Sequence, residues 1–352
     1  MKKLNLLLVL ALLGTLFFNS CTKDDKKENF PYDNGVFITN EGPFQSGSGT
    51  ITFYDKATGL TQEKIFETVN AMPLGNIVQS MNIFNNKAYI VVNNANKVEI
   101  VNSGTFESLG SIENFNLPRY FLGISLSKAY VSCWDNTVAV VNLDDNSIVK
   151  NIQTQSGPET MIKYNDKVFV LNSGGFGVDS TITVINSETD EVLSTIQTAK
   201  VPSGIQIDKN NNMWVLCSGQ GWNGFPQETD TKGHLICLNP NDYSVVKDII
   251  FPASDKHPQK LIINKNKDIL YYSYIDGVYS FDINSDNLND SPLISHAMFY
   301  NIGFDNNDRT IYASDAKDFA QDGIVYIYNS NDGAVVDSIN AGVVPGSFYF
   351  ND

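Results

Sequence analysis

The chain has 352 residues and a formal net charge of −15, with 42% hydrophobic and 18% charged residues. The apolar content is sufficient for a folded core, and the acidic excess argues against partners that need clustered positive charge, namely nucleic acid and anionic lipid headgroups. The simplest interpretation of the charge is solubility. The length would allow two or three ordinary domains, but an internal repeat described below favours one closed domain.

The N-terminus carries a bacterial export signal over residues 1–20, in which two lysines precede an apolar run that extends to Phe18. The run is too short and wrongly flanked for a stable membrane span. It ends in Phe-Asn-Ser-Cys at residues 18–21, which resembles a lipobox, the cleavage site of bacterial lipoproteins, although Phe18 replaces the more usual leucine. The resemblance implies that Cys21 becomes the lipid-bearing N-terminus. The alternative is an ordinary signal peptide with a chance cysteine.

Residues 21–31 are expected to form a lipidated flexible tether, because this segment is charged and nearly without apolar side chains. Within it, Lys23, Asp24 and Asp25 resemble the Lys-acidic-acidic signal that sends some Gram-negative lipoproteins to the outside of the outer membrane. A solvated spacer is the alternative. The resemblance implies a protein at the outer membrane and cell surface that meets the membrane through its lipid anchor alone.

Residues 32–352 repeat one pattern seven times, with four short strands in each repeat and no helical stretch between them. The second strands are β-branched and aromatic and are bounded by Asn, Asp or Gly turns, as is typical of strands. They are expected at residues 36–40, 87–91, 128–133, 167–172, 213–217, 269–273 and 310–314. The third strands are expected at residues 51–54, 98–101, 138–141, 182–185, 235–238, 278–281 and 325–328. An Asn or Asp follows each third strand and favours a turn closed by its own side chain.

In five repeats a proline marks the start of the inner strand, since the first position of a strand tolerates proline. These residues are Pro118, Pro158, Pro202, Pro258 and Pro345. Residues 346–351 read as an inner strand without a blade of its own, and residues 36–40 as a second strand without a preceding partner. The C-terminal strand therefore completes the first blade and closes the ring. The prediction is an all-β, seven-bladed β-propeller with four-stranded antiparallel blades.

Three cysteines follow Cys21, and buried thiols are favoured for them. A disulfide remains open to Cys217 and Cys237, which are predicted on neighbouring strands of one blade. The three histidines show no metal-ligand spacing with one another or with a cysteine, and no catalytic constellation stands out. We therefore expect no metal, no cofactor and no catalytic residue. This argues only weakly against an enzyme, because propeller active sites assemble from residues distant in sequence.

The loops between second and third strands, and those leading into each inner strand, emerge on one face around the central channel. On this face the loops are long and aromatic, whereas the opposite turns are short, so a ligand-binding surface is expected here. The aromatic loop residues are Phe44, Trp134, Phe176, Trp222, Phe225 and Phe319. The starts of the inner strands add Arg119, Tyr120, Glu159 and Tyr300. The alternative is that the aromatic residues pack together and only stiffen the loops.

The strand at residues 181–186 and the Pro202-led inner strand that follows resemble the YncE-like seven-bladed propellers, and the resemblance covers nearly all of residues 36–352. With the lipobox, the chain is similar to the BtuG-type surface lipoproteins. In that family a propeller captures cobalamin and passes it to a TonB-dependent outer-membrane transporter. The resemblance implies corrinoid binding without assigning ligand residues. The alternatives are a propeller lactonase-type hydrolase and a protein- or glycan-binding module.

Overall fold

The computed structural model describes residues 30–44, 46–296 and 298–351. The export signal expected at residues 1–20, the lipid-bearing Cys21 and nearly all of the tether lie outside the described residues. The chain divides after Pro31, and Tyr32–Asp352 form one compact unit. Within the described residues, no helix has the length and apolar character needed to span a membrane.

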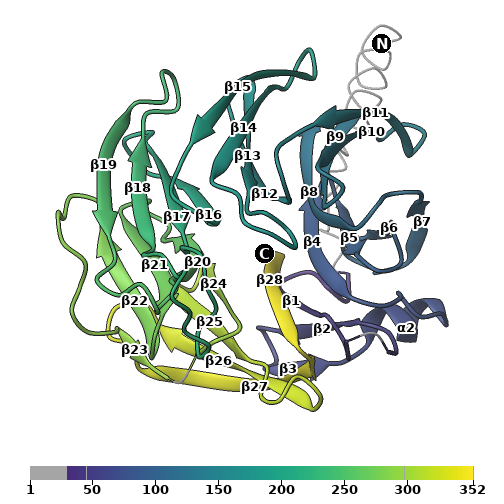
Figure 1. Ribbon diagram of the computed structural model, residues 1–352. Helices are drawn as coiled ribbons and strands as arrows, with labels where there is room; N and C mark the ends of the chain where they lie inside the picture. The colour runs from purple at the N-terminus through teal and green to yellow at the C-terminus, as the bar shows by residue number, and fades with distance from the viewer. Residues whose placement is uncertain (1–29, 45, 297, 352) are drawn as a thin grey trace, which may run out of the picture. The chain divides into compact units, whose positions relative to one another are not determined.

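The compact unit consists of seven four-stranded antiparallel sheets around a common axis, as predicted (Figure 1). We number these blades 1 to 7 along the chain and give their strands from the inside outward. Blade 1 contains β28 (Pro345–Asn351), β1 (Gly35–Asn40), β2 (Thr50–Asp55) and β3 (Leu60–Gln62). Blade 2 contains β4 (Val78–Phe84), β5 (Lys87–Val92), β6 (Lys97–Asn102) and β7 (Ser108–Ile112). Blade 3 contains β8 (Pro118–Ser125), β9 (Lys128–Cys133), β10 (Thr137–Asn142) and β11 (Ser147–Gln153).

The remaining blades follow the same order of strands. Blade 4 contains β12 (Pro158–Tyr164), β13 (Lys167–Asn172), β14 (Thr181–Asn186) and β15 (Glu191–Gln197). Blade 5 contains β16 (Pro202–Ile207), β17 (Met213–Cys217), β18 (His234–Leu238) and β19 (Val245–Ile250). Blade 6 contains β20 (Gln259–Ile263), β21 (Ile269–Tyr274), β22 (Gly277–Asp282) and β23 (Ile294–Ser295). Blade 7 contains β24 (Asn301–Asp305), β25 (Thr310–Asp315), β26 (Asp322–Asn329) and β27 (Val335–Val343).

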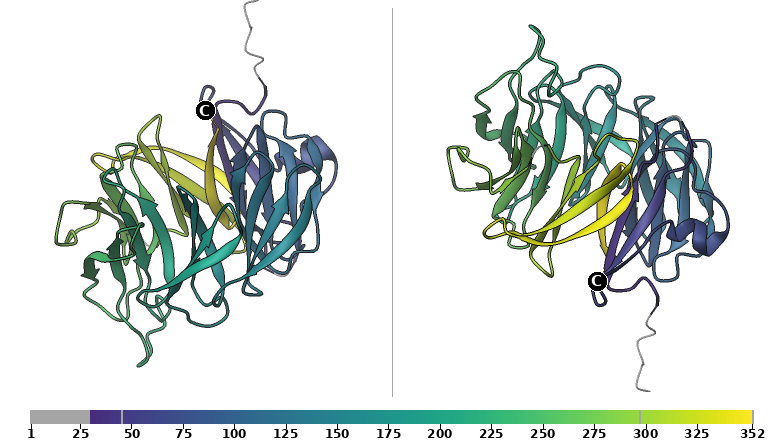
Figure 2. Two further views of the ribbon diagram at one scale, coloured as in Figure 1. Left: turned by 90° about the horizontal axis from the view of Figure 1, so that it is seen from above. Right: turned by 90° about the horizontal axis from the view of Figure 1, so that it is seen from below.

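The C-terminal strand closes the ring, which confirms the prediction. β28 pairs antiparallel with β1, with Val36 opposite Phe350 and Ile38 opposite Phe348. The inner strands contact one another in the cyclic order β4, β8, β12, β16, β20, β24 and β28, so the last strand of the chain meets β4. Figure 2 shows the blades from the side, with their connecting loops gathered at the two ends of the strands. Those two ends are the two faces of the propeller.

The core lies between neighbouring blades and is built mainly from second and third strands. Every residue of β17 is buried, whereas most of β15, an outermost strand, is exposed. The largest fully buried side chains of the second strands are Trp214, Tyr89, Tyr130, Tyr272 and Tyr312. Each such side chain contributes about 2 kcal/mol by leaving water. This burial explains why the second strands are rich in β-branched and aromatic residues.

The predicted turn after each third strand is present in all seven blades. The side-chain oxygen of the Asn or Asp accepts a hydrogen bond from the N–H two residues on, at 2.8–3.0 Å. The acceptors are Asp55, Asn102, Asn142, Asn186, Asn239, Asp282 and Asn329. A short side chain that imitates a backbone turn in this way explains why only Asn and Asp occupy the position.

One helix departs from the expectation that no helical stretch separates the strands. α2 (Ile65–Asn70) lies between β3 and β4, and its Ile65 and Phe66 are buried in the core shared by blades 1 and 2. The Asn70 amide donates a hydrogen bond to the Phe106 carbonyl at 3.0 Å. Six residues cannot form a stable helix alone in water, so tertiary packing rather than a readable periodicity produces this turn.

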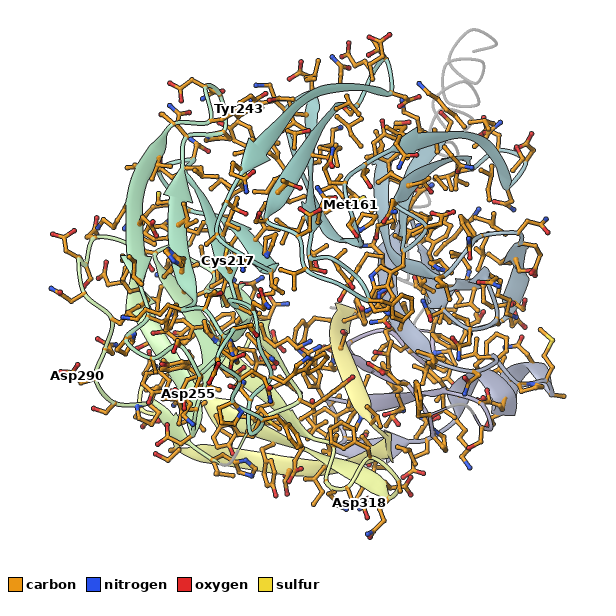
Figure 3. The ribbon with its side chains drawn as sticks, in the orientation of Figure 1. Met161, Cys217, Tyr243, Asp255, Asp290 and Asp318 are labelled. Atoms are coloured by element: carbon orange, nitrogen blue, oxygen red, sulfur yellow. The ribbon has the colours of Figure 1, made fainter. Side chains whose placement is uncertain are left out.

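The cysteines of the described residues are buried free thiols. Cys217, labelled within the sheets in Figure 3, pairs in register with His234, whereas Cys237 pairs with Trp214. The two cysteines are therefore three positions apart along the strands, about 10 Å, which is too far for a disulfide. The disulfide left open by the sequence does not form, and the expectation of buried thiols is confirmed.

Candidate functional site

The inner strands of six blades share an irregularity near their first residues, where the pairing register shifts. The shifts lie between Val78 and Ser80, Pro118 and Tyr120, Pro158 and Met161, Pro202 and Gly204, Gln259 and Ile262, and Pro345 and Phe348. A bulge of this kind bends the strand and re-aims a side chain. The residues inside the bulges include Gln79, Arg119, Glu159, Ser203 and Lys260. The repeat therefore places polar side chains where most of the inner strands leave the loop face.

Arg119 is the centre of one group of contacts at this position. Its Nε lies 3.0 Å from Glu159 Oε1 in the next blade, and its guanidinium also donates to Gln79 in the preceding blade. The same Glu159 oxygen accepts a 2.7 Å hydrogen bond from Trp134 Nε1. The guanidinium carbon lies 4.0 Å from the centroid of the Trp134 ring, and Phe176 meets that ring edge-on at 5.0 Å. Three blades are tied together by one cation and one carboxylate.

Glu41 and Tyr300 form a second group across the same face. Tyr300 precedes β24 and donates a 2.7 Å hydrogen bond to Oε1 of Glu41, which follows β1. Lys260 Nζ lies 5.7 Å from the centroid of the Tyr300 ring, within the range of a cation–π interaction. Phe319 meets the same ring edge-on at 5.6 Å. This group joins blades 1, 6 and 7.

The two groups are coupled electrostatically. Burial raises the pKa of Glu41, although the hydrogen bond from Tyr300 and the nearby Lys260 and Arg119 oppose the rise. Burial lowers the pKa of Lys260, and the carboxylates of Glu41 and Glu159 oppose that fall. Burial also raises the pKa of Tyr300, and Glu41 adds to the rise. Two acids and two bases thus form one electrically balanced cluster, which we call the channel-mouth cluster: Glu41, Arg119, Glu159 and Lys260.

Large aromatic side chains stand in solvent on the loops around this cluster. The most exposed are Phe44, Phe176, Trp222 and Phe225, with 73–86% of each side chain accessible. Phe319 is 49% exposed, and Trp134 is half-buried beneath Phe176. Single exposed apolar residues are ordinary on a protein surface, but several on one rim mark a binding surface.

The longest loop of this face joins β17 to β18 and carries Trp222 and Phe225. It is fixed to the chain just before β20 by the buried His257, whose Nδ1 lies 3.0 Å from the Ser218 carbonyl oxygen. The backbone of His257 also exchanges two hydrogen bonds with the Asn223 side chain, at 2.9 and 3.0 Å. The exposed rings are therefore presented by a loop with a defined anchor, not by a free tether.

The structure brings together only part of the residue set predicted from the sequence. Arg119, Glu159, Trp134 and Phe176 form one contact group, and Tyr300 and Phe319 form the other. Burial raises the pKa of the half-buried Tyr120, and Glu159 adds to the rise, which places Tyr120 beside the cluster. Phe44, Trp222 and Phe225 have no ring contact with another aromatic residue among the described residues. The aromatic side chains therefore do not all pack together to stiffen the loops.

Sequence reasoning missed Glu41, Gln79 and Lys260 as members of the site. Gln79 and Lys260 lie in bulges equivalent to those of Arg119 and Glu159, so the register of the repeat could have found them. Glu41 is brought to Tyr300 by closure of the ring over 259 residues of chain, which no local pattern reveals. Within the described residues, no three His, Cys, Asp or Glu side chains are grouped as around a metal ion.

The fold and the loop face define a seven-bladed β-propeller. The chain belongs to the family described as "Domain of unknown function (DUF5074)", whose match covers residues 34–351. Comparison with curated protein sequences gives no match.

Several solved structures share the fold. A quinonprotein alcohol dehydrogenase-like protein from Bacteroides thetaiotaomicron is similar with a TM-score of 0.69 and 16% identity, over 91% of this chain and 79% of that chain. The Kuenenia stuttgartiensis hydrazine synthase has a TM-score of 0.57 and 13% identity, over 74% of this chain and 85% of that chain. The computationally designed Ika8 protein has a TM-score of 0.58 and 12% identity, over 88% and 89%. At these identities the similarity concerns the fold alone.

Proposed function

We propose that this protein is a non-enzymatic surface lipoprotein, anchored through Cys21, that binds a corrinoid on its loop face and delivers it to a TonB-dependent transporter. The observation that carries the proposal is the exposed aromatic rim, with Phe44, Phe176, Trp222 and Phe225, set around the balanced channel-mouth cluster. The resemblance of the sequence to BtuG-type lipoproteins supports the choice of ligand.

The chemistry of the rim suits a large amphipathic ligand. Aromatic side chains offer broad apolar contact at low cost in conformational entropy. A corrinoid has an apolar ring face and a periphery of amide groups, so it needs both rings and hydrogen-bonding groups from its receptor. Glu41, Arg119 and Glu159 supply donors and acceptors within the same face. Their balanced charge suits a ligand that carries many amides rather than a strongly ionic one.

Isothermal titration of the purified protein with cyanocobalamin tests the proposal directly. We expect micromolar or tighter binding, with tryptophan fluorescence changing as the exposed Trp222 is covered. The Trp222→Ala variant should weaken binding by about tenfold or more, as an aromatic anchor of an interface does. If titration with micromolar cyanocobalamin gave no heat of binding, the assignment of a corrinoid ligand would be wrong.

A matched control uses an equally exposed apolar residue on the opposite face. Leu126 lies in the β8–β9 turn and is 74% exposed. Leu126→Ala should leave cyanocobalamin binding unchanged. Equal losses in Leu126→Ala and Trp222→Ala would place the site away from the aromatic rim.

The channel-mouth cluster also favours a second candidate, a propeller hydrolase of the lactonase type. A carboxyl with a raised pKa and an amine with a lowered pKa at one mouth are the groups that acid–base catalysis uses. A panel of lactones, assayed with wild type and with Glu41→Gln, separates the candidates. Turnover that Glu41→Gln removes would favour the hydrolase over the binding protein.

A further inference from the structure

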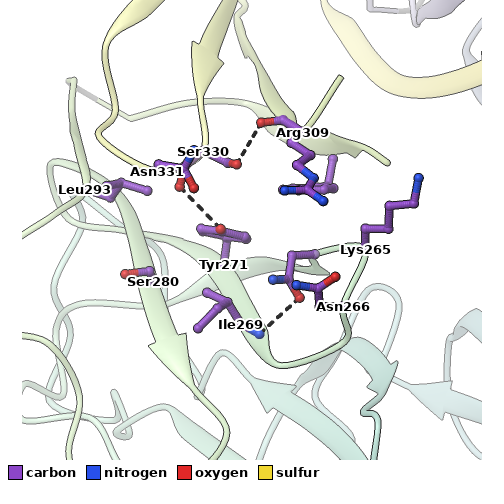
Figure 4. A pocket seen from close by; sticks show the side chains of 11 residues that line it. Lys265, Asn266, Ile269, Tyr271, Ser280, Leu293, Arg309, Ser330 and Asn331 are labelled. Atoms are coloured by element: carbon purple, nitrogen blue, oxygen red, sulfur yellow. Dashed lines mark hydrogen bonds between the residues drawn. The ribbon is translucent and has the colours of Figure 1, made fainter. Parts of the chain in front are cut away.

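A cleft of about 300 Å³ lies where blade 6 meets blade 7, on the face opposite the aromatic loops (Figure 4). Its lining comes from the β20–β21, β24–β25 and β26–β27 turns, from β21, β22 and β24, and from the residues before β23. In Figure 4 the Lys265 and Arg309 side chains lie on one side of the cleft, and Leu293 and Ser280 lie on the other. The volume is at the lower end of small-molecule sites and suits a small ligand rather than a polymer.

We call the line along which two neighbouring blades meet on this face a seam. At the seam between blades 3 and 4, an ion pair occupies the place of the cleft. Lys128, the first residue of β9, places its Nζ 2.8 Å from Oδ1 of Asp190 in the β14–β15 turn. Tyr130, two residues on, donates a hydrogen bond to the same carboxylate. β21 keeps the tyrosine of this pattern as Tyr271 but has Ile269 in place of the lysine. Ile269 lines the cleft.

The carboxylate of that ion pair is also replaced at the blade 6–7 seam. Gly333 occupies the place of Asp190: both residues have positive φ, 70° and 58°, and both N–H groups donate at 2.9 Å to the carbonyl of the Asn that ends the preceding strand. A Cβ at position 333 would lie 2.1 Å from the Leu293 carbonyl oxygen, so glycine is required there. The tyrosine hydroxyl, now Tyr271, donates to the Ser330 carbonyl at 3.4 Å. With Ile269 at the lysine position and Gly333 at the aspartate position, no ion pair fills the seam between blades 6 and 7.

Two cations border this opening without an anion. Among the described residues, neither the Lys265 ammonium nor the Arg309 guanidinium has a hydrogen bond or ion pair. At two other places on this face a lysine is partnered: Lys56 lies 2.9 Å from Asp305, and Lys209 lies 3.2 Å from Asp268. In a chain with a net charge of −15, unpaired cations beside an open cleft favour an anionic ligand.

We propose that the cleft binds a small organic carboxylate. Arg309 and Lys265 hold the carboxylate group, and the planar guanidinium of Arg309 matches its two oxygens. Ile269 and Leu293, both half-buried, pack against a short apolar body. The ligand thereby supplies the negative charge that Asp190 supplies at the blade 3–4 seam. This site is separate from the aromatic rim, so it does not rest on corrinoid binding.

Ligand-observed NMR on the purified full-length protein tests the site, with indole-3-acetate and benzoate as probes and indole-3-acetamide as the neutral counterpart. We expect at least one of the two carboxylates to bind, and the acetamide to bind at least about tenfold more weakly than indole-3-acetate, since it lacks the charge. Arg309→Gln should weaken carboxylate binding by a similar factor. Binding of neither carboxylate, or equal binding of acid and amide, would overturn the proposal.

Two further variants separate the cleft from a general effect of surface charge. Ile269→Trp enlarges a half-buried side chain that lines the cleft without adding charge, so it should fill the space for the apolar body and abolish binding. Lys267→Gln removes a cation from the same turn as Lys265 but outside the lining of the cleft, so binding should persist. Retained binding in Ile269→Trp, or an equal loss in Lys267→Gln, would show that the carboxylate is held elsewhere.

Discussion

Arg119 and Glu159 occupy equivalent bulges in neighbouring blades and are joined by a 3.0 Å ion pair that is largely shielded from water. The Arg119 guanidinium also lies over the Trp134 ring, and Nε1 of that ring donates a hydrogen bond to the same oxygen of Glu159. Three side chains are therefore held by one shared oxygen. Removing one member leaves the others incompletely paired in a poorly solvated site, which costs more than the loss of an exposed ion pair.

Replacing Arg119 should accordingly destabilise the protein. We expect Arg119→Met to lower the free energy of unfolding by about 2 kcal/mol, because it leaves Glu159 without its cation. The control is Lys209→Met, which breaks an ion pair whose lysine side chain is 47% exposed and should cost less than about 1 kcal/mol. Urea denaturation of both variants measures the difference, and equal effects would contradict the special role of the Arg119 group.

Glu41 makes the stability depend on pH. Its pKa in the folded protein is raised above the ordinary value of 4.5 by burial, so the carboxyl costs stability as the pH rises from 4.5 through the raised value. Glu41→Gln removes that cost and keeps an acceptor for the Tyr300 hydroxyl. The variant should match wild type below pH 4.5 and become more stable than wild type as the pH rises toward neutrality.

Denaturation of both proteins across this pH range is the measurement. A stability difference that shrinks or reverses with rising pH would mean that Lys260 and Arg119 outweigh burial and hold the folded pKa of Glu41 below its ordinary value.

Much of the architecture could be predicted from the sequence because the determinants are local and repeated. Short buried runs of β-branched and aromatic residues, prolines that open inner strands and an Asn or Asp after each third strand recur in every blade or most of them, so each confirms the others. Ring closure followed from one unmatched strand at each end. α2 escaped prediction because Ile65 and Phe66 become helical through burial between two blades, not through a periodic pattern.

The site could be predicted only in part, because its contacts join residues from different blades. The loop aromatics were visible as departures from the repeat, and Arg119 and Glu159 as charges after the inner-strand prolines. The contact of Tyr300 with Glu41 depends on closure of the ring. The cleft of blades 6 and 7 depends on Ile269 and Gly333, which stand where Lys128 and Asp190 stand between blades 3 and 4. These replacements can be recognised only by comparing the two seams in the structure.

Ring closure predicts a strong effect of shortening the C-terminus. Deleting residues 345–351 removes β28, exposes the edge of β1 and breaks the 2.7 Å hydrogen bond from the Met81 N–H to the Tyr349 hydroxyl. We expect loss of the cooperative unfolding transition in circular dichroism, because the cores of blades 1 and 7 open together. A truncated protein that unfolds as cooperatively as wild type would refute closure by β28.

The anchored loop that presents Trp222 and Phe225 can be tested through two of its glycines, which differ in the space around them. Gly221 and Gly224 both have positive φ, 135° and 85°. A Cβ at Gly221 would lie 2.3 Å from His257 Nε2 and 2.5 Å from Asp230 Oδ1, whereas a Cβ at Gly224 would meet nothing within 4 Å. Both alanine variants carry backbone strain of about 1–3 kcal/mol, but only Gly221→Ala must also displace the buried His257 and its contact with Ser218.

Gly221→Ala should therefore release the loop, whereas Gly224→Ala should leave it anchored. Limited proteolysis is the appropriate measurement, because the loop opens locally while the blades stay folded. We expect rapid cleavage between β17 and β18 in Gly221→Ala, with the unfolding transition of the blades little changed. Since the loop presents two of the four most exposed aromatic rings, the same variant should also weaken cyanocobalamin binding. Equal protease resistance of the two variants would mean that His257 does not anchor the loop.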